Sequence, residues 1–188
     1  MIDKNIINRK SIVCFGEKPV PDSILVRLFE AASWAPSSFN QQPWRFIIGK
    51  KGEKAYNKIF DSLTEGNRVW ANNAPILLVS VAEEVSGYNN KINKYAWHDT
   101  AMAYSNLVYQ ATSEGMYLHP MGGYSKETII NRFEIPKGFQ PIVVAALGYK
   151  GDCKGMPANV IERENSKRTR KPVKDFVYGD NWGKQIFK

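Results

Sequence analysis

Two near-continuous apolar runs constrain the fold of this chain more than any other feature. Residues 75–82 read PILLVSVA and residues 141–149 read PIVVAALGY. Runs of this length and β-branched content predict strands, and the first is apolar enough to be covered on both faces. Between and before them we predict helices at 21–35, 51–63, 95–114 and 126–133 and strands at 43–49 and 116–119, the first of which we expect to be buried. This alternation predicts an α/β or α+β sandwich with helices over a sheet.

The predicted helix at 95–114 is long for a small domain. It would measure about 30 Å, and small residues such as Ala101 and Ser105 alternate in it with aromatic ones such as Trp97. Helices that are apolar on most sides are buried, so we expect this one to pack against more than its own sheet. After Gly151 the chain becomes a polar, basic arm without periodicity, which ends in Phe176, Tyr178, Trp182 and Phe187. A partner subunit would bury both features.

The composition is that of a globular protein. The chain has 188 residues, of which 43% are hydrophobic and 23% charged, and this argues against disorder or a fibrous repeat. No run approaches the ~20 apolar residues of a membrane span, and the first ten residues show no signal-peptide core. With Cys14 and Cys153 as the only cysteines, a disulfide framework is not expected. We therefore expect a protein of the reducing cytoplasm, with Cys14 acting as a small buried apolar side chain.

The net charge of +8 indicates a polyanionic partner. Nucleic acid, an acidic membrane and a phosphorylated small molecule all fit on charge alone. His98 and His119 have no cysteine or carboxylate set at metal-ligand spacing, and the sequence contains neither a P-loop nor a nucleophile elbow. Side-chain nucleophiles therefore do not account for an activity, whereas a bound cofactor would.

Two polar clusters lie in the first quarter of the chain. Residues 9–11, RKS, offer two cations and a hydroxyl, which suit a phosphate or, equally, a solvated basic turn. Residues 35–44, APSSFNQQPW, place hydroxyl and amide side chains between prolines. Donors and acceptors of both kinds suit a heteroaromatic ring with alternating carbonyls and ring nitrogens, although ordinary loops have a similar composition.

Two further clusters lie in the second half. Residues 119–124, HPMGGY, fall between a predicted strand and helix, and adjacent glycines let a ligand approach backbone N–H groups. A plain turn is the alternative there. Residues 167–172, KRTRKP, place Arg168 and Arg170 on one face of an extended arm. That arrangement suits a phosphate clamp or a nucleic-acid-binding tail.

Taken together and in this order, the clusters resemble the motifs of the nitroreductase family of flavin-dependent oxidoreductases. RKSIVCF is similar to the family's R-R-S-x-R-x-F, and APSSFNQQPWRF to its A-P-S-x-x-N-x-Q-P-W-x-F. HPMGGY resembles the P-x-G-G or P-x-E-G turn, RTRKP the late K/R-x-R-x-P, and the segment around GDNWG is also similar. The resemblance spans about residues 7–183, and four motifs in register carry more weight than one.

The resemblance implies an α+β fold with a central, mostly antiparallel sheet flanked by helices. It also implies an intertwined homodimer with an extended C-terminal arm, in which each of two FMN sites is built from both chains. Residues 1–160 would form the FMN-binding domain, and residues 161–188 would form its arm, which clamps the phosphate and wraps the partner. The long helix at 95–114 would form the core of the dimer.

The resemblance further implies roles for individual residues. The FMN phosphate would be held by Arg9, Ser11, Arg168 and Arg170, with Lys10 contributing through its backbone or charge. The ring would be lined from the other subunit by Pro36, Ser37, Ser38, Asn40 and Gln42. The turn Pro120, Met121, Gly122 and Gly123 would present the Gly122 N–H toward flavin N5. Acceptor-pocket aromatic residues would be Phe39, Trp70 and Tyr124.

One position departs from the family pattern. Val13 stands where the family usually has a second Arg or Lys near the pyrimidine side of the flavin. A cation there stabilises the reduced ring, so its absence should make the flavin potential more negative unless another cation substitutes.

The implied activity is a two-step, ping-pong hydride transfer. NAD(P)H would reduce FMN, and a flat, electron-poor acceptor such as a nitroaromatic or a quinone would take the hydride, with no side chain acting as an obligate acid. Reduction of an enone, a halophenol or a free flavin on the same scaffold is an alternative. A nucleic-acid-binding module that uses the basic arm is a second one. The flavoenzyme interpretation implies no nucleic-acid, membrane or metal partner.

Overall fold

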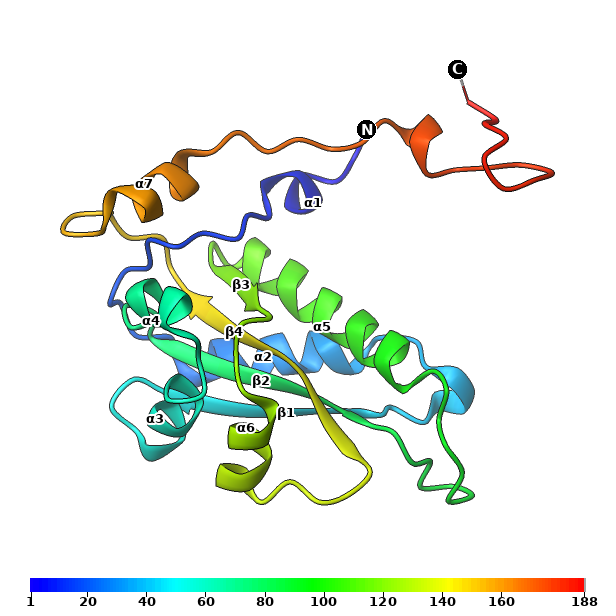
Figure 1. Ribbon diagram of the computed structural model, residues 1–188, viewed down its shortest axis with the longest axis horizontal. Helices are drawn as coiled ribbons and strands as arrows, with labels where there is room; N and C mark the ends of the chain where they lie inside the picture. The colour runs from blue at the N-terminus through cyan, green and yellow to red at the C-terminus, as the bar shows by residue number, and fades with distance from the viewer. Residues whose placement is uncertain (188) are drawn as a thin grey trace.

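The computed structural model describes residues 1–187 and has one four-stranded sheet at its centre (Figure 1). The strands are β1 (Trp44–Lys50), β2 (Ile76–Glu83), β3 (Tyr117–Met121) and β4 (Phe139–Gly148). They lie in the order β1-β2-β4-β3, and every neighbouring pair is antiparallel. The predicted α+β fold with a mostly antiparallel central sheet is confirmed.

Helices cover both faces of this sheet. On one face lie α2 (Asp22–Ser33) and α5 (Ala96–Ser113), and on the other α3 (Lys54–Phe60), α4 (Glu65–Ala71) and α6 (Lys126–Phe133). Alternate residues of β2 serve the two cores: Leu77 and Val79 face α3, α4 and α6, whereas Ile76 and Leu78 face α2 and α5. Seven of the eight β2 residues are buried, and this explains why the run at 75–82 has no polar face.

Three short helices escaped the sequence analysis. These are α1 (Lys4–Asn8), α4 and α7 (Ala158–Asn165). They show no apolar stripe at helical spacing, because α1 buries no residue, α4 buries the adjacent pair Trp70 and Ala71, and α7 buries Val160 and the charged Glu164. The helix predicted at 51–63 ends as α3 at Phe60, and α4 follows it after a turn. The strand predicted as buried at 43–49 is β1, which lies at the sheet edge and buries only Gly49.

The C-terminal part of the chain returns along the N-terminal segment before it leaves the body. Gly16 N donates to Tyr149 O at 2.9 Å, and Gly151 N donates to Cys14 O at 2.9 Å. Beyond α7 the chain runs past α1 and away from the sheet (Figure 1), and its Trp182 side chain is 93% exposed. The predicted division between residues 160 and 161 falls inside α7.

The two cysteines correct one expectation. Cys14 is fully buried, as predicted, but it forms a disulfide with Cys153. The two residues are 139 apart in sequence, and they meet because the chain after β4 pairs with the N-terminal segment at Phe15 and Lys150. Within residues 1–187, no helix combines the length and the apolar content that a membrane crossing requires.

Candidate functional site

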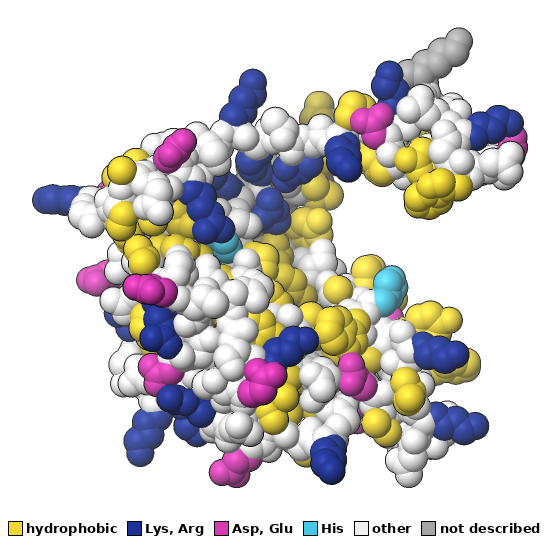
Figure 2. All heavy atoms as spheres, viewed as in Figure 1, with side chains coloured by type: hydrophobic (Ala, Val, Ile, Leu, Met, Phe, Trp, Pro, Cys, Tyr) yellow, Lys and Arg dark blue, Asp and Glu magenta, His cyan; other side chains and the backbone are white. Residues whose placement is uncertain are grey.

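Three arginines from the two ends of the chain gather beside α5. Arg9 Nη1 donates to Ser11 Oγ at 3.1 Å. Arg168 donates to the carbonyl oxygens of Ile7, at 2.7 Å, and Arg9. Arg170 lies close enough for its charge to act on Arg9. We call Arg9, Ser11, Arg168 and Arg170 the basic cluster. Figure 2 shows Lys and Arg side chains along the underside of the arm, above a hollow with an apolar floor.

The basic cluster has the electrostatics of an anion site. Burial, followed by the positive charges of Arg168 and Arg170, lowers the pKa of Arg9. Among residues 1–187, no carboxylate lies within ion-pair distance of these three arginines. The Tyr104 hydroxyl, on the same stretch of α5, is buried and has no hydrogen-bond partner in that range. Like charges held together without a counter-ion fit a phosphate, which accepts several charge-assisted hydrogen bonds.

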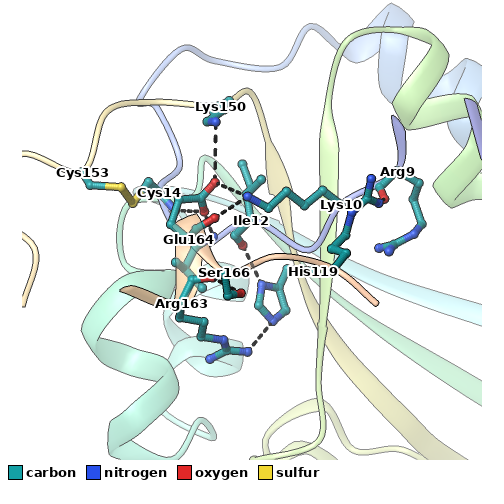
Figure 3. Close-up of polar contacts among 12 residues, drawn as sticks. Arg9, Lys10, Ile12, Cys14, His119, Lys150, Cys153, Arg163, Glu164 and Ser166 are labelled. Atoms are coloured by element: carbon teal, nitrogen blue, oxygen red, sulfur yellow. Dashed lines mark hydrogen bonds and ion pairs between the residues drawn. A yellow bond between two sulfur atoms is a disulfide. The ribbon is translucent and has the colours of Figure 1, made fainter. Parts of the chain in front are cut away.

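The fifth predicted phosphate residue, Lys10, has a different partner. Its ammonium group donates to the backbone oxygen of Glu164 and lies 3.2 Å from Glu164 Oε1 (Figure 3). Glu164 Oε2 also accepts from the backbone N–H of Val13 at 2.8 Å and of Cys14 at 3.4 Å. The Lys10 side chain therefore ties α7 to the N-terminal segment, and only its backbone and long-range charge remain for a phosphate.

Glu164 is a buried carboxylate that the sequence analysis missed. Its side chain is 2% exposed. Burial alone would raise its pKa, but the hydrogen bonds from Val13 and Lys10 outweigh burial and lower the pKa of Glu164 below its usual value. The ionised carboxylate thus holds together the two segments that carry the basic cluster.

His119 fixes the same segment against the sheet. Its Nδ1 lies 2.6 Å from Ile12 O, and because a carbonyl only accepts, Nδ1 carries the proton. Nε2 is then free to accept from Arg163 Nη2 at 3.0 Å. The ring is 4% exposed and stacks on Trp70 with a centroid separation of 4.4 Å. Burial, assisted by the nearby charge of Arg163, lowers the pKa of His119 to about 4, so the imidazole is neutral.

This histidine predicts a loss of stability in mild acid. The unfolded chain, with a pKa of 6.5, binds the proton more readily than the folded one, with a pKa of about 4. Stability therefore falls as the pH drops between these values, by about 2 kcal/mol from pH 7 to pH 5. Urea unfolding at both pH values should show this drop in the native chain and a smaller one in His119→Gln. Equal drops in the two proteins would contradict the assignment.

The glycine turn after β3 has one crowded and one open position. A Cβ on Gly123 would lie 2.7 Å from Thr64 Oγ1, and Gly123 O accepts from Asn67 Nδ2 at 3.0 Å. A Cβ on Gly122 would meet nothing within 4 Å, and among residues 1–187 the Gly122 N–H has no hydrogen-bond partner. Met121 is buried and Pro120 is exposed at the end of β3. The turn is thus fixed on α4, has room beside Gly122, and leaves the Gly122 N–H without a partner among residues 1–187.

The loop at 36–42 is held in an unusual conformation at the other end of α5. Phe39, Asn40 and Gln42 all have positive φ, between 48° and 54°, a region that residues other than glycine enter at a cost. Buried Asp99 accepts from Ser38 N at 2.9 Å, and Ser37 Oγ accepts from Gln42 N at 3.0 Å. These bonds and the bracketing prolines hold Ser37, Ser38, Asn40 and Gln42 at the surface.

The structure does not bring this loop and the basic cluster together within one chain. The loop is attached to Asp99, whereas Arg9 lies near Tyr104 and Tyr109. Five and ten residues of helix separate Asp99 from Tyr104 and Tyr109, which corresponds to about 8 and about 15 Å. Within one chain the loop and the basic cluster therefore lie at different points along α5.

Of the three aromatic residues predicted to line a pocket, Phe39 and Tyr124 reach the surface and Trp70 is buried in the core. Phe39 is 95% exposed at the loop tip. Tyr124 is half-buried, and its hydroxyl donates to Pro141 O at 3.0 Å. Trp70 is 1% exposed and packed between Phe15 and His119 in the core. The prediction that Trp70 lines a pocket is therefore wrong, because the apolar face of α4 turns it toward the sheet.

The chain is similar to known proteins in sequence and in fold. The model of the nitroreductase family matches residues 6–69 and 50–149. A 15.4 kDa protein of Mycolicibacterium smegmatis without an assigned function is 29% identical over 150 residues, which cover 76% of this chain and 99% of that protein. A protein of Archaeoglobus fulgidus, provisionally named NADH dehydrogenase/NAD(P)H nitroreductase, is 28% identical over 159 residues, covering 80% and 86%. A crystal structure described as an oxidoreductase containing FMN aligns with a TM-score of 0.90 and 32% identity over 98% of this chain and 94% of that one. The chain therefore belongs to the nitroreductase family.

Proposed function

We propose that this protein is an FMN-dependent oxidoreductase that takes hydride from NAD(P)H and passes it to a small, electron-poor acceptor of the nitroaromatic or quinone type. The observation that carries the proposal is the basic cluster, in which Arg9, Arg168 and Arg170 converge without a carboxylate among residues 1–187. The similarity to the oxidoreductase containing FMN supports the choice of cofactor. The relative provisionally named as an NAD(P)H nitroreductase supports the choice of electron donor.

The residues present fit FMN at its two ends. The basic cluster would hold the phosphate through charge-assisted hydrogen bonds. The unpartnered Gly122 N–H would donate to the ring, and the loop at 36–42 of a second copy would cover it with hydroxyl and amide groups. When bound, FMN supplies the hydride chemistry, and the protein contributes binding, orientation and electrostatics.

A homodimer is part of this proposal, because the loop at 36–42 and the basic cluster of each site would come from different chains. On α5, Trp97, Ala101, Ser105 and Tyr109 follow one another at four-residue spacing, and Trp97 and Tyr109 are 45% and 37% exposed. None of these four residues is among those that α5 buries, and the stripe would pack against the same helix of the partner. The exposed aromatic residues of the arm would be buried on the partner in the same assembly.

Replacing Ser105 by Arg tests the dimer. A long charged side chain in the middle of the stripe should separate the subunits and, with them, abolish FMN retention, because each site would lose its second half. Sedimentation velocity and the visible absorbance of the purified protein measure the two effects. Ser113→Arg, at the exposed end of α5, is the control. Loss of the dimer with full FMN retention would show that the site is not shared.

The activity is tested by anaerobic reduction followed by an acceptor screen. The purified protein should be yellow, NADH or NADPH should bleach the flavin band, and a nitroaromatic or a quinone should restore it. Double-reciprocal plots of the steady-state rate against donor concentration, at several acceptor concentrations, should give the parallel lines of a ping-pong mechanism. Enones, halophenols and free FMN belong in the same screen, because they separate the alternative reductions. A bound flavin that neither nicotinamide bleaches would reject the proposed donor.

A further inference from the structure

We propose that Arg163 is a second cation of the flavin site, one that faces the ring rather than the phosphate, and that His119 is its positioning residue. This proposal rests on the proposed function. It adds a positive charge beside the flavin ring, a role that neither the basic cluster nor the glycine turn fills. Arg163 belongs to α7, a helix whose existence the sequence pattern did not reveal.

The contacts of Arg163 hold its guanidinium in place without neutralising it. Nη2 donates to His119 Nε2 at 3.0 Å, and the guanidinium carbon lies 5.8 Å from the centroid of the Trp70 ring. Among residues 1–187, no carboxylate lies within ion-pair distance of Arg163. A guanidinium has five N–H donors, so most of them remain available to a ligand.

His119 is built to act as an acceptor. Ile12 O, 2.6 Å from Nδ1, fixes the tautomer in which Nε2 carries a lone pair. Burial keeps the ring neutral, and stacking on Trp70 sets the ring plane. Figure 3 shows the resulting chain of contacts from Ile12 through His119 to Arg163. A buried side chain with both ring nitrogens in hydrogen bonds orients the arginine, and within the described residues 1–187 Nε2 has no other partner.

Arg163 lies between the two ends of the proposed flavin site. Ile12, at one side of His119, is next to Ser11 of the basic cluster. On the other side, β3 ends at Met121, directly before Gly122. Trp70, which stacks on His119, belongs to α4, and Asn67 of that helix binds Gly123 O. A ligand that spans from the basic cluster to the glycine turn passes the His119–Arg163 pair.

The chemistry of the ring gives this cation a role. A two-electron-reduced flavin loses a proton near neutral pH and carries negative charge on its pyrimidine edge, whereas the oxidised ring is neutral. A fixed positive charge nearby stabilises the reduced form selectively. Val13, where the family usually has a cation, is fully buried and contributes only its backbone N–H to Glu164. Arg163 supplies the charge that position 13 lacks.

The test is the midpoint potential of the bound flavin, measured anaerobically against reference dyes. Arg163→Gln should weaken binding of reduced relative to oxidised flavin at least tenfold, which makes the potential about 30 mV more negative for two electrons. Arg163→Lys should restore part of the shift, because it keeps the charge without the planar fork. His119→Phe should move the potential in the same direction by a smaller amount, since it frees the guanidinium without removing it.

The charge-matched control is Lys137→Gln. Lys137 is exposed in the turn between α6 and β4, so the variant loses one positive charge far from α7 and should keep the native potential. If Arg163→Gln and Lys137→Gln both keep it, Arg163 does not face the ring and the inference is overturned, while FMN binding stands. If the native protein fails to take up FMN, the proposed function and this inference fall together. Arg163→Lys guards against loss of folding, because a full shift there with intact circular dichroism would also contradict a charge effect.

Discussion

Replacing Arg168 and Arg170 together by alanine should weaken FMN binding by two to four orders of magnitude. Each guanidinium would donate charge-assisted hydrogen bonds to the phosphate, and such bonds contribute about 1.5–3 kcal/mol each. Two losses amount to about 3–6 kcal/mol, and each ~1.4 kcal/mol corresponds to a factor of ten. Fluorescence titration of the apoprotein with FMN measures the change directly.

The single variants Arg168→Ala and Arg170→Ala separate the loss of phosphate binding from the loss of contacts that hold the N-terminal segment. Arg168 also donates to the carbonyl oxygens of Ile7 and Arg9, so its removal loosens the N-terminal segment as well. Among residues 1–187, the Arg170 side chain donates a hydrogen bond only to the carbonyl oxygen of its neighbour Thr169, so Arg170→Ala reports on the phosphate alone. The double variant Lys171→Ala/Lys174→Ala removes the same charge from the same arm and should bind FMN almost normally. Equal affinities in both double variants would refute the phosphate assignment.

Replacing Glu164 by alanine should lower the free energy of unfolding by about 3–5 kcal/mol. The substitution leaves the backbone N–H groups of Val13 and Cys14 without their acceptor and strands Lys10 beside them. Removal of one partner from a buried ionic and hydrogen-bonded group has a cost of this size. Urea denaturation with the disulfide intact measures the difference.

Glu162 offers a matched control on the same helix. Its side chain is exposed, and Glu162→Ala should change stability by less than ~0.5 kcal/mol. Glu164→Gln, which keeps one acceptor oxygen, should fall between the two. The Glu164 variant should also retain FMN poorly, because Arg9 and Arg168 would no longer be held in register. A drop below 1 kcal/mol in Glu164→Ala would mean that the carboxylate does not hold the two segments together.

The central strands of the sheet could be predicted from the sequence because each is a continuous apolar run of neighbouring residues. The runs that became β2 and β4 are apolar on both faces, and no other common structure buries such a run at that length. The helix α5 was predicted to within about one residue at each end. The short helices α4 and α7 were missed because their buried residues, Trp70 with Ala71 and Val160 with Glu164, form no apolar stripe. The equally short α6, which carries Ile129, Ile130 and Phe133 at helical spacing, was predicted.

The sequence indicated which residue types the candidate site contains, but not which contacts connect them. Arg9, Ser11, Arg168 and Arg170 stood out because charged and hydroxyl residues cluster there in family-like motifs. The acceptor role of Glu164 depends on contacts across about 150 residues of sequence, as does the pairing of Cys14 with Cys153. Positive φ at Phe39, Asn40 and Gln42 likewise has no local signal, since none of them is glycine.

The separation of the loop at 36–42 from the basic cluster along α5 has a genetic consequence. Suppose that each catalytic centre combines the loop of one polypeptide with the arginines of the other. A loop defect and an arginine defect carried by different polypeptides of one assembly then fall on the same centre. Two inactive alleles, one defective in the loop and the other in the arginines, would then complement each other when co-expressed. Every mixed assembly would contain one doubly defective centre and one that is wholly intact.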